Sequence, residues 1–182
     1  MIYLFLAEGF EEVEAITPLD ILRRAGADIK TVSVKCDELC VEGAHGISVM
    51  ADIDISEVKV DEAEMIILPG GGKGTENLKA SEELRDIILA VNEREGYIAA
   101  ICAAPTILGE LGLLNKRRAT CYPSLAGELI TSGAKYKNDK VVIDGHFITS
   151  EGAGTAADFG FALMDKFYSK SETDSLRLTM VY

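Results

Sequence analysis

The chain has 182 residues, of which 48% are hydrophobic and 26% charged, as expected for one globular domain rather than a disordered chain. Its formal net charge is −12, and such an acidic surface repels phosphate backbones and lacks the basic clusters that hold proteins to anionic membranes. No apolar stretch reaches the roughly 18–20 residues that span a bilayer. We therefore expect neither nucleic acid nor membrane as a partner.

The chain opens with an apolar run, residues 1–7, that stops at Glu8. This run is too short for a signal peptide and predicts a first buried strand. Without a secretion signal, free thiols and a cytoplasmic location are the expectation. This applies to all four cysteines, which are Cys36, Cys40, Cys102 and Cys121.

Short strand patterns alternate with longer helical patterns along most of the chain. In chain order we predict a strand at Ile2–Ala7, a helix at Glu11–Ala25, strands at Ile29–Val34, Ile47–Ala51 and Met65–Leu68, a helix at Ser81–Arg94, a strand at Tyr97–Ile101, a helix from Cys102 through Leu111, a short strand at Ala119–Cys121, a hairpin of Val141–Ile143 with Phe147–Thr149, and a helix at Gly154–Tyr168. This order predicts an α/β fold with a mostly parallel, doubly wound sheet and helices on both faces.

Residues 1–168 are expected to form one domain, because no repeat or linker interrupts them. Residues 169–182 are a C-terminal tail with a mixed pattern. Its end, Leu176–Tyr182, alternates enough to be an added strand or a packed arm, and a frayed tail is equally compatible with the sequence.

Cys102 is the sharpest candidate for chemistry. It follows a buried strand directly and precedes Pro105, which suits the first turn of a helix, so the thiol is expected on a tight strand-to-helix turn. Amides at the helix start would favour the thiolate and lower the pKa of Cys102, and they would also stabilise an oxyanion or a sulfinate. A small buried core cysteine fits the local pattern about as well.

Two other segments follow predicted strands, and ligands of doubly wound sheets bind at those strand ends. Residues 69–74 are glycine-rich but lack the spacing of a phosphate loop, so a nucleotide site is poorly supported. The amide of Gly71 would complete an oxyanion hole, although a plain tight turn explains the glycines equally well. Among the acids at the first helix start, Glu14 has the register to face the sheet end, where burial near a thiolate would raise its pKa.

The sequence resembles the ThiJ/PfpI superfamily, in the branch of the parkinsonism-associated protein deglycase and its bacterial relatives. The similarity extends from Phe5 to about Phe167. It is carried by Ala-Glu-Gly-Phe-Glu-Glu-Val-Glu at 7–14, Arg-Arg-Ala-Gly at 23–26, Leu-Pro-Gly-Gly at 68–71, Ala-Ala-Ile-Cys-Ala-Ala-Pro at 99–105 and Thr-Ser-Glu-Gly-Ala-Gly-Thr at 149–155.

The resemblance implies a flavodoxin-like three-layer sandwich, a homodimer and no cofactor or metal. It implies that Cys102 is the oxidisable nucleophile, Glu14 its protonated partner, and the amides of Gly71 and Ala103 its donors. It further implies substrate-binding positions near the dimer contact at Arg24 and at His45, where relatives often carry an arginine.

Two departures from relatives narrow the function. Ala103 stands where the protease-like branch has a histidine, which makes a peptidase doubtful. Tyr122 stands where some deglycase relatives have a histidine, and a tyrosine does not act as a base near neutral pH, so proton transfer would fall to Glu14. The resemblance thus implies an enzyme for reactive dicarbonyls or glycated adducts. The alternative is a non-catalytic oxidation sensor or redox-regulated chaperone that uses a Cys102 sulfinate.

Overall fold

The computed structural model describes all 182 residues and contains one large sheet and two small ones. The strands are β1 (Ile2–Leu6), β2 (Ile29–Ser33), β3 (Cys40–Glu42), β4 (Ser48–Met50), β5 (Ile53–Asp54), β6 (Met65–Leu68), β7 (Tyr97–Ile101), β8 (Arg118–Ala119), β9 (Lys135–Tyr136), β10 (Val141–Asp144) and β11 (Phe147–Ser150). The helices are α1 (Glu12–Arg24), α2 (Gly72–Ala80), α3 (Glu82–Glu93), α4 (Pro105–Glu110), α5 (Ala126–Thr131), α6 (Ala156–Met164) and α7 (Lys170–Thr179).

The large sheet has seven strands in the order β10-β11-β7-β6-β1-β2-β5. All neighbours in it are parallel except the β10–β11 hairpin. The strand order reverses between β1 and β6, which is where doubly wound sheets bind ligands, beyond the carboxyl ends of the strands. The predicted α/β fold with a mostly parallel sheet is therefore confirmed.

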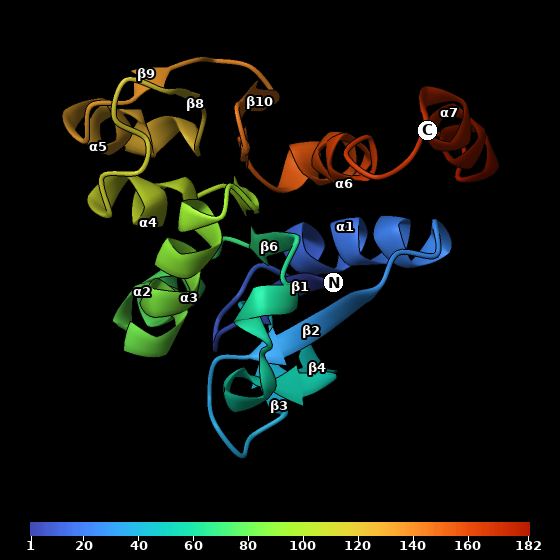
Figure 1. Ribbon diagram of the computed structural model, residues 1–182, viewed down its shortest axis with the longest axis horizontal. Helices are drawn as coiled ribbons and strands as arrows, with labels where there is room; N and C mark the ends of the chain where they lie inside the picture. Colours follow the sequence, from blue (N-terminus) through green and yellow to red (C-terminus); the bar gives the residue numbers. More distant parts are fainter.

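Helices cover both faces of this sheet (Figure 1), because alternate residues of each strand point to opposite sides. In β1, for example, Phe5 belongs to the core under α2, α3, α4 and α5, whereas Leu4 belongs to the core under α1 and α6. These two cores hold 25 and 20 buried residues. No helix is long and apolar enough to cross a membrane.

Most predicted elements are present, with small differences in their bounds and pairing. The predicted strand at Ile47–Ala51 is the shorter β4, which pairs with β3 as a hairpin outside the large sheet. The predicted strand at Ala119–Cys121 corresponds to β8, which pairs with β9 in a second small sheet. The glycine-rich segment that we described as a turn continues into α2 at Gly72, a helix that the sequence analysis missed.

Of the alternatives left open for the C-terminal tail, the added strand and the frayed tail are wrong, since residues 170–179 form the helix α7 and this helix packs against the domain. Ser169 begins this helix with a capping box, because its hydroxyl accepts from the N–H of Glu172 and its own N–H donates to the Glu172 carboxylate. Leu176 and Met180, four residues apart, lie on one side of the helix and pack against the core under α1 and α6. Capping and helical spacing here outweigh the alternating pattern of the sequence.

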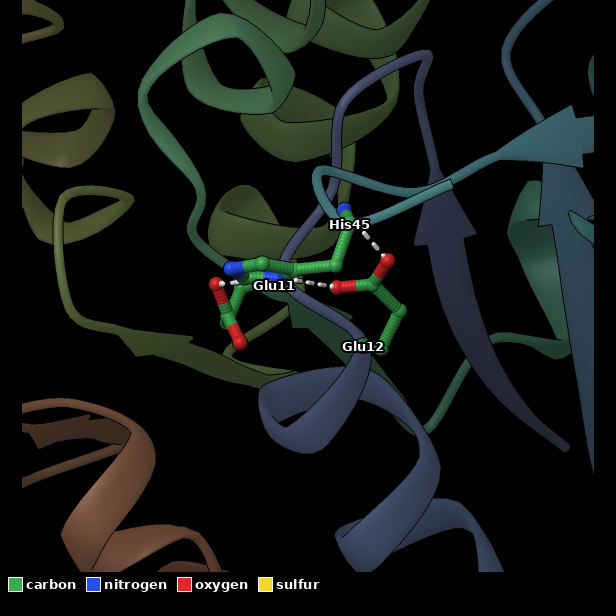
Figure 2. Close-up of side chains that lie close together, drawn as sticks. All are labelled: Glu11, Glu12 and His45. Atoms are coloured by element: carbon green, nitrogen blue, oxygen red, sulfur yellow. Dashed lines mark hydrogen bonds and ion pairs between the residues drawn. The ribbon is translucent and has the colours of Figure 1, made fainter. Parts of the chain in front are cut away.

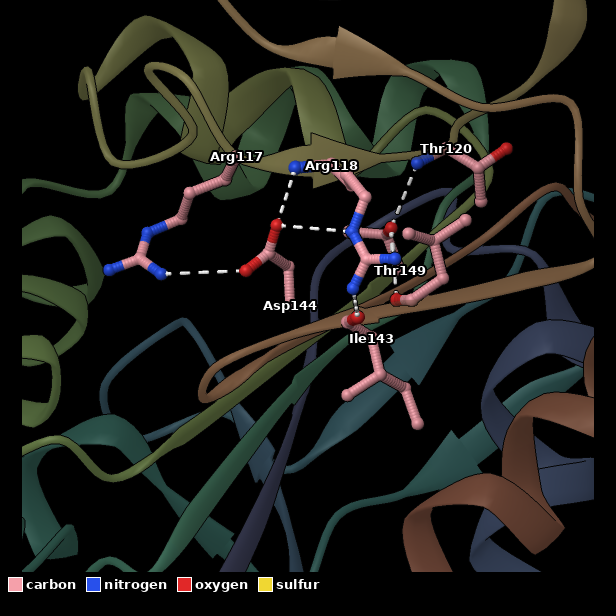
Figure 3. Close-up of polar contacts among 7 residues, drawn as sticks. Arg117, Arg118, Thr120, Ile143, Asp144 and Thr149 are labelled. Atoms are coloured by element: carbon pink, nitrogen blue, oxygen red, sulfur yellow. Dashed lines mark hydrogen bonds and ion pairs between the residues drawn. The ribbon is translucent and has the colours of Figure 1, made fainter.

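The segment around β8 is tied to β10 and β11 by polar contacts (Figure 3). The carboxylate of Asp144 accepts the N–H of Arg118 at 2.8 Å and lies 3.9 Å from the guanidinium of Arg117. The N–H of Thr120 donates to the hydroxyl of Thr149 at 2.9 Å. These contacts fix the path of the chain just before Tyr122, which reaches the end of β7.

Candidate active site

The candidate site is built where β1, β6 and β7 end side by side in the large sheet. The chain leaves β1 into the start of α1, which carries Glu14. It leaves β6 through the two glycines Gly70 and Gly71, and it leaves β7 at Cys102. The sheet thus brings together three segments that the sequence analysis selected from separate parts of the chain.

Cys102 occupies a strained turn directly after β7. Its φ of 65° lies in the left-handed region, which is uncommon for a residue other than glycine and is a feature of functional sites. Its N–H donates to the carbonyl of Ser150 and its carbonyl accepts the N–H of Tyr122 at 2.8 Å, so neighbouring segments hold the turn. The thiol is half-buried, and the backbone N–H groups of Gly71 and Ala103 lie close enough to favour its thiolate. The structure therefore brings the two predicted donors near the sulfur.

Glu14 lies on the first turn of α1 and is 1% exposed. The N–H of Gly70 donates to its Oε2 at 2.9 Å, and the thiol of Cys102 and the backbone of Ala153 lie close enough to favour its ionised form. No lysine or arginine pairs with it. The structure thus brings together the pair of Cys102 and Glu14 that was predicted from the sequence.

The two glycines after β6 are needed for this contact. A side-chain Cβ at Gly70 would lie 2.5 Å from Oε2 of Glu14 and 2.7 Å from Cβ of Cys102, so only a glycine lets the backbone approach the pair. Gly71 has a φ of 89°, and a Cβ there would lie 2.4 Å from the carbonyl oxygen of Gly9, so this position also favours a glycine. This segment is therefore more than a plain turn, because its glycines let the backbone approach Cys102 and Glu14.

Burial raises the pKa of the Glu14 carboxyl to about 7, although hydrogen bonds from Cys102, Gly70 and Ala153 act in the opposite direction. This is the direction that the sequence predicted. A carboxyl with this pKa gains and loses a proton readily near neutral pH, as a general acid and base must.

The predicted lowering of the Cys102 pKa is wrong. Burial raises the pKa of this thiol to about 12, and the charge of ionised Glu14 adds to the effect, whereas the amides of Gly71 and Ala103 favour the thiolate. Helix α4 has only six residues and begins at Pro105, so its dipole is too small and too distant to outweigh burial. Cys102 thus needs Glu14 to take its proton before the sulfur can attack.

A fourth segment, the loop after β11, was missed as part of the site. A Cβ placed on Gly152 would lie 3.9 Å from the sulfur of Cys102, 3.8 Å from Oε1 of Glu14 and 3.5 Å from the ring of Tyr122. This loop therefore covers the pair, and Tyr122 lies beside it. The loop reaches the site because β11 pairs with β7 in parallel, and parallel neighbours end at the same edge of the sheet.

His45 lies at the start of α1 rather than at the thiol, in the loop between β3 and β4 (Figure 2). Its Nδ1 lies 2.8 Å from Oε2 of Glu12 and 3.7 Å from Oε2 of Glu11, and its N–H donates to Oε1 of Glu12 at 2.7 Å. These contacts raise the pKa of His45.

Glu11, Glu12 and His45 are also close enough to share a metal ion, since their ligand atoms all lie within 4.8 Å of one another. However, the contacts within the group already pair its carboxylates with His45, and the positive end of the α1 dipole disfavours a cation there. We therefore assign the three residues as an ion-paired cluster.

Arg24 is not brought to Cys102 within one chain. It is at the last turn of α1, ten residues beyond Glu14 and hence about 15 Å along the helix axis. Its guanidinium pairs with Asp20 at 2.7 Å. A role for Arg24 at the candidate site therefore requires a second copy of the chain.

Comparisons with known proteins agree with this architecture. The sequence model of the DJ-1/PfpI family matches residues 1–166. Among solved structures, Drosophila melanogaster DJ-1beta superposes with a TM-score of 0.94 at 32% identity, covering 99% of this chain and 96% of that one. An oxidised DJ-1 of Toxoplasma gondii superposes with a TM-score of 0.93 at 30% identity, covering 100% and 97%. The flavodoxin-like fold is therefore confirmed.

Curated relatives carry functional names. A Caenorhabditis elegans protein named glutathione-independent glyoxalase DJR-1.2 is 32% identical, over 93% of this chain and 89% of the relative. A Pyrococcus abyssi protein named deglycase is 32% identical, over 81% of this chain and 87% of the relative. The DJ-1 homolog A of Arabidopsis thaliana is 35% identical over 94% of this chain, which spans only 44% of that relative.

Proposed function

This chain belongs to the DJ-1/PfpI family, and from that premise we propose that it is a stress-protective enzyme of the glyoxalase or deglycase type. Its substrates would be small reactive dicarbonyls or the adducts that they form on proteins. The names of the nematode and archaeal relatives support this class of substrate. The observation that carries the proposal is the close approach of the Cys102 thiol and the buried Glu14 carboxyl, which flank Gly70.

The proposed reaction begins when the Glu14 carboxylate takes the thiol proton and the sulfur of Cys102 attacks the aldehyde carbon of a 2-oxoaldehyde. The aldehyde oxygen gains negative charge, which the N–H groups of Gly71 and Ala103 are placed to stabilise. Protonation of this oxygen by Glu14 gives a hemithioacetal. Glu14 is the only carboxyl that affects the pKa of the thiol, so it would serve every proton transfer.

In the second stage, the Glu14 carboxylate removes the proton from the carbon bonded to sulfur and returns it to the neighbouring carbonyl carbon, and the hydroxyl proton of the hemithioacetal passes to the oxygen of that carbonyl. One carbon is thereby oxidised to a thioester and its neighbour reduced to an alcohol, so no external oxidant or reductant is required. Water then cleaves the thioester, releases a 2-hydroxy acid and restores the thiol of Cys102. With methylglyoxal the product is lactate.

The test is to measure lactate formed from methylglyoxal by the wild type, by Cys102→Ala and by Cys36→Ala. Lactate is the right product to follow because any thiol or amine can consume free dicarbonyl. We expect many turnovers in the wild type and in Cys36→Ala, whose cysteine is exposed and outside the site, and none in Cys102→Ala. No lactate beyond one equivalent per chain would overturn the proposal.

The second candidate function is the oxidation sensor or redox-regulated chaperone. It is favoured by the partial exposure of Cys102 together with the amides of Gly71 and Ala103, which would also hold the oxygens of a sulfinate. Peroxide should then add two oxygen atoms to Cys102 before any other cysteine, as intact-mass and peptide mass spectrometry would show. Preferential oxidation without lactate turnover would make this the better account.

We further propose that the chain forms a homodimer through the outer side of α1 and the β3–β4 hairpin. Val13 on α1 is 47% exposed, and Ile47 and Met50 on the hairpin are 57% and 67% exposed. Exposed apolar side chains of this size are typical of a subunit contact. A dimer would also give Arg24 and His45 a route to a substrate at the partner's site. Light scattering should report a dimer for the wild type and a monomer for a Met50→Glu, Val13→Glu double variant.

A further inference from the structure

Gly152, in the loop after β11, is a glycine that the fold itself does not require. Its backbone is extended, with a φ of 162° and a ψ of −167°, so its conformation does not depend on the freedom of a glycine. Apart from its chain neighbours, no atom lies closer than 3.5 Å to the position of a Cβ on Gly152, which is ordinary van der Waals contact. Gly70 differs in this respect, because a Cβ there would lie 2.5 Å from Oε2 of Glu14.

The space beside Gly152 is bounded by groups of the candidate site. The three atoms nearest to its Cβ position are Cδ2 of Tyr122 at 3.5 Å, Oε1 of Glu14 at 3.8 Å and the sulfur of Cys102 at 3.9 Å. Gly152 is buried, whereas Cys102 and Tyr122 are both partly exposed. The missing side chain therefore leaves a methyl-sized space that touches the sulfur, the carboxyl and the aromatic ring.

The proposed reaction needs a space with these neighbours. The aldehyde carbon of the substrate bonds to the sulfur of Cys102, and the carbonyl carbon beside it lies one bond further away. Because Glu14 moves a proton between these two carbons, the second carbon and its substituent must lie within reach of both the sulfur and the carboxyl. The Cβ position of Gly152 meets both conditions, and the ring of Tyr122 offers an apolar contact for a methyl substituent.

We propose that Gly152 determines the size of the substrate that this site accepts, because the space left by its missing side chain holds the second carbon of the dicarbonyl and its substituent. This inference rests on the proposed function, since it concerns the substrate of the same Cys102–Glu14 pair. A methyl group at residue 152 would fill the space without a clash in the folded chain. In pockets of this kind, one methylene changes reactivity by roughly 10- to 200-fold.

Alkylation of Cys102 tests the inference without any turnover. Iodoacetamide resembles the dicarbonyl, because the carbon that bonds to sulfur is followed by a carbonyl carbon, whereas iodomethane adds a single carbon. Mass spectrometry of the Cys102 peptide gives both rates, and their ratio does not depend on the thiolate fraction because both reagents consume the thiolate. The variant is Gly152→Ala. Its matched control is Gly154→Ala, which places a methyl in the same loop where no atom lies within 4 Å.

In Gly152→Ala the ratio of the iodoacetamide rate to the iodomethane rate should fall about ten-fold, and Gly154→Ala should keep the wild-type ratio. An unchanged ratio in Gly152→Ala, an equal fall in Gly154→Ala, or a Gly152→Ala chain that does not fold would overturn the inference. In turnover assays, Gly152→Ala should lower kcat/KM for methylglyoxal more than for glyoxal, which lacks the methyl group. If the wild type makes no lactate, the proposed function fails, while the alkylation ratio still decides the role of Gly152.

Discussion

Two glutamates on the first turn of α1, only two residues apart, have pKa values shifted in opposite directions. Glu12 is 6% exposed and Glu14 is 1% exposed, so both carboxyls are buried. Burial acts to raise the pKa of Glu12, but hydrogen bonds from the ring and backbone of His45 and from its own N–H outweigh it and lower the value to about 2. The pKa of Glu14 instead rises to about 7.

The difference lies in what the two carboxyls face. Glu12 meets an imidazole that is able to carry a positive charge, and a backbone N–H binds its second oxygen. Glu14 meets the thiol of Cys102, which carries no positive charge, and the negative charge of Glu11 opposes its ionisation. One glutamate is thereby fixed as an anion with a structural role, and its neighbour is free to exchange a proton.

The largest expected effect concerns turnover. Glu14→Gln should reduce the rate of lactate formation by roughly 10² to 10⁴, because the amide takes no proton from the thiol or from the hemithioacetal. Glu12→Gln should reduce it by less than about ten-fold, since the amide oxygen still accepts the N–H of His45. Lactate assays at saturating methylglyoxal measure both. Equal losses in the two variants would contradict the separation of their roles.

The dependence of stability on pH should also distinguish the two residues. The pKa of Glu14 is raised from its ordinary value of 4.5 to about 7 in the folded protein. Its contribution to the free energy of unfolding is therefore present in full below pH 4.5 and is lost as the pH rises through 7. The wild type should therefore lose about 3 kcal/mol relative to Glu14→Gln between pH 4.5 and 8.5. Urea unfolding of both proteins across this range measures the loss.

Glu12 should show the reverse dependence. Because its pKa is lowered, its contribution to folding is present above pH 4.5 and is lost as the pH falls toward 2. In a plot of the free energy of unfolding against pH, Glu12→Gln should flatten the acid side and leave the alkaline side unchanged. A flattened alkaline side in Glu12→Gln would mean that the two carboxyls titrate as one unit.

A smaller effect is expected on the reactivity of the thiol. The charge of ionised Glu14 contributes to the high pKa of Cys102, so Glu14→Gln should lower that pKa and increase the thiolate fraction at pH 8. Each unit of lowering gives about ten-fold more thiolate, and alkylation by iodoacetamide should accelerate on that order. Mass spectrometry of the Cys102 peptide follows the rate, and Glu12→Gln should alkylate at the wild-type rate.

The smallest effect is predicted for the partner of Glu12. His45→Ala removes the imidazole, so the pKa of Glu12 should rise from about 2 toward its ordinary 4.5, while Glu14 should still titrate near 7. Carboxyl ¹³C NMR titration of the variant measures both values. A shift of Glu14 in the same variant would show that the ion-paired cluster and the Cys102–Glu14 pair are coupled.

The sequence by itself determined most of the elements of this protein and pointed to the pair of residues at its candidate site. Strand and helix periodicity are local properties, so β1, α1, β6, α3 and β7 were predicted close to their observed bounds. Cys102 and Glu14 were also predicted, because each follows a buried strand and the carboxyl ends of parallel strands meet at one edge. Local capping likewise explains α7, although the alternating pattern of the tail hid it.

Only the tertiary structure decided what surrounds these groups. The burial that raises the pKa of Cys102, the hydrogen bonds from His45 that lower the pKa of Glu12, and the N–H of Gly70 that donates to Glu14 all come from segments distant in the chain. A pKa depends on desolvation and on charges within a few ångströms, whatever their order in the sequence. The positions of His45 and Arg24 at opposite ends of α1 follow in the same way from the packing of the folded chain.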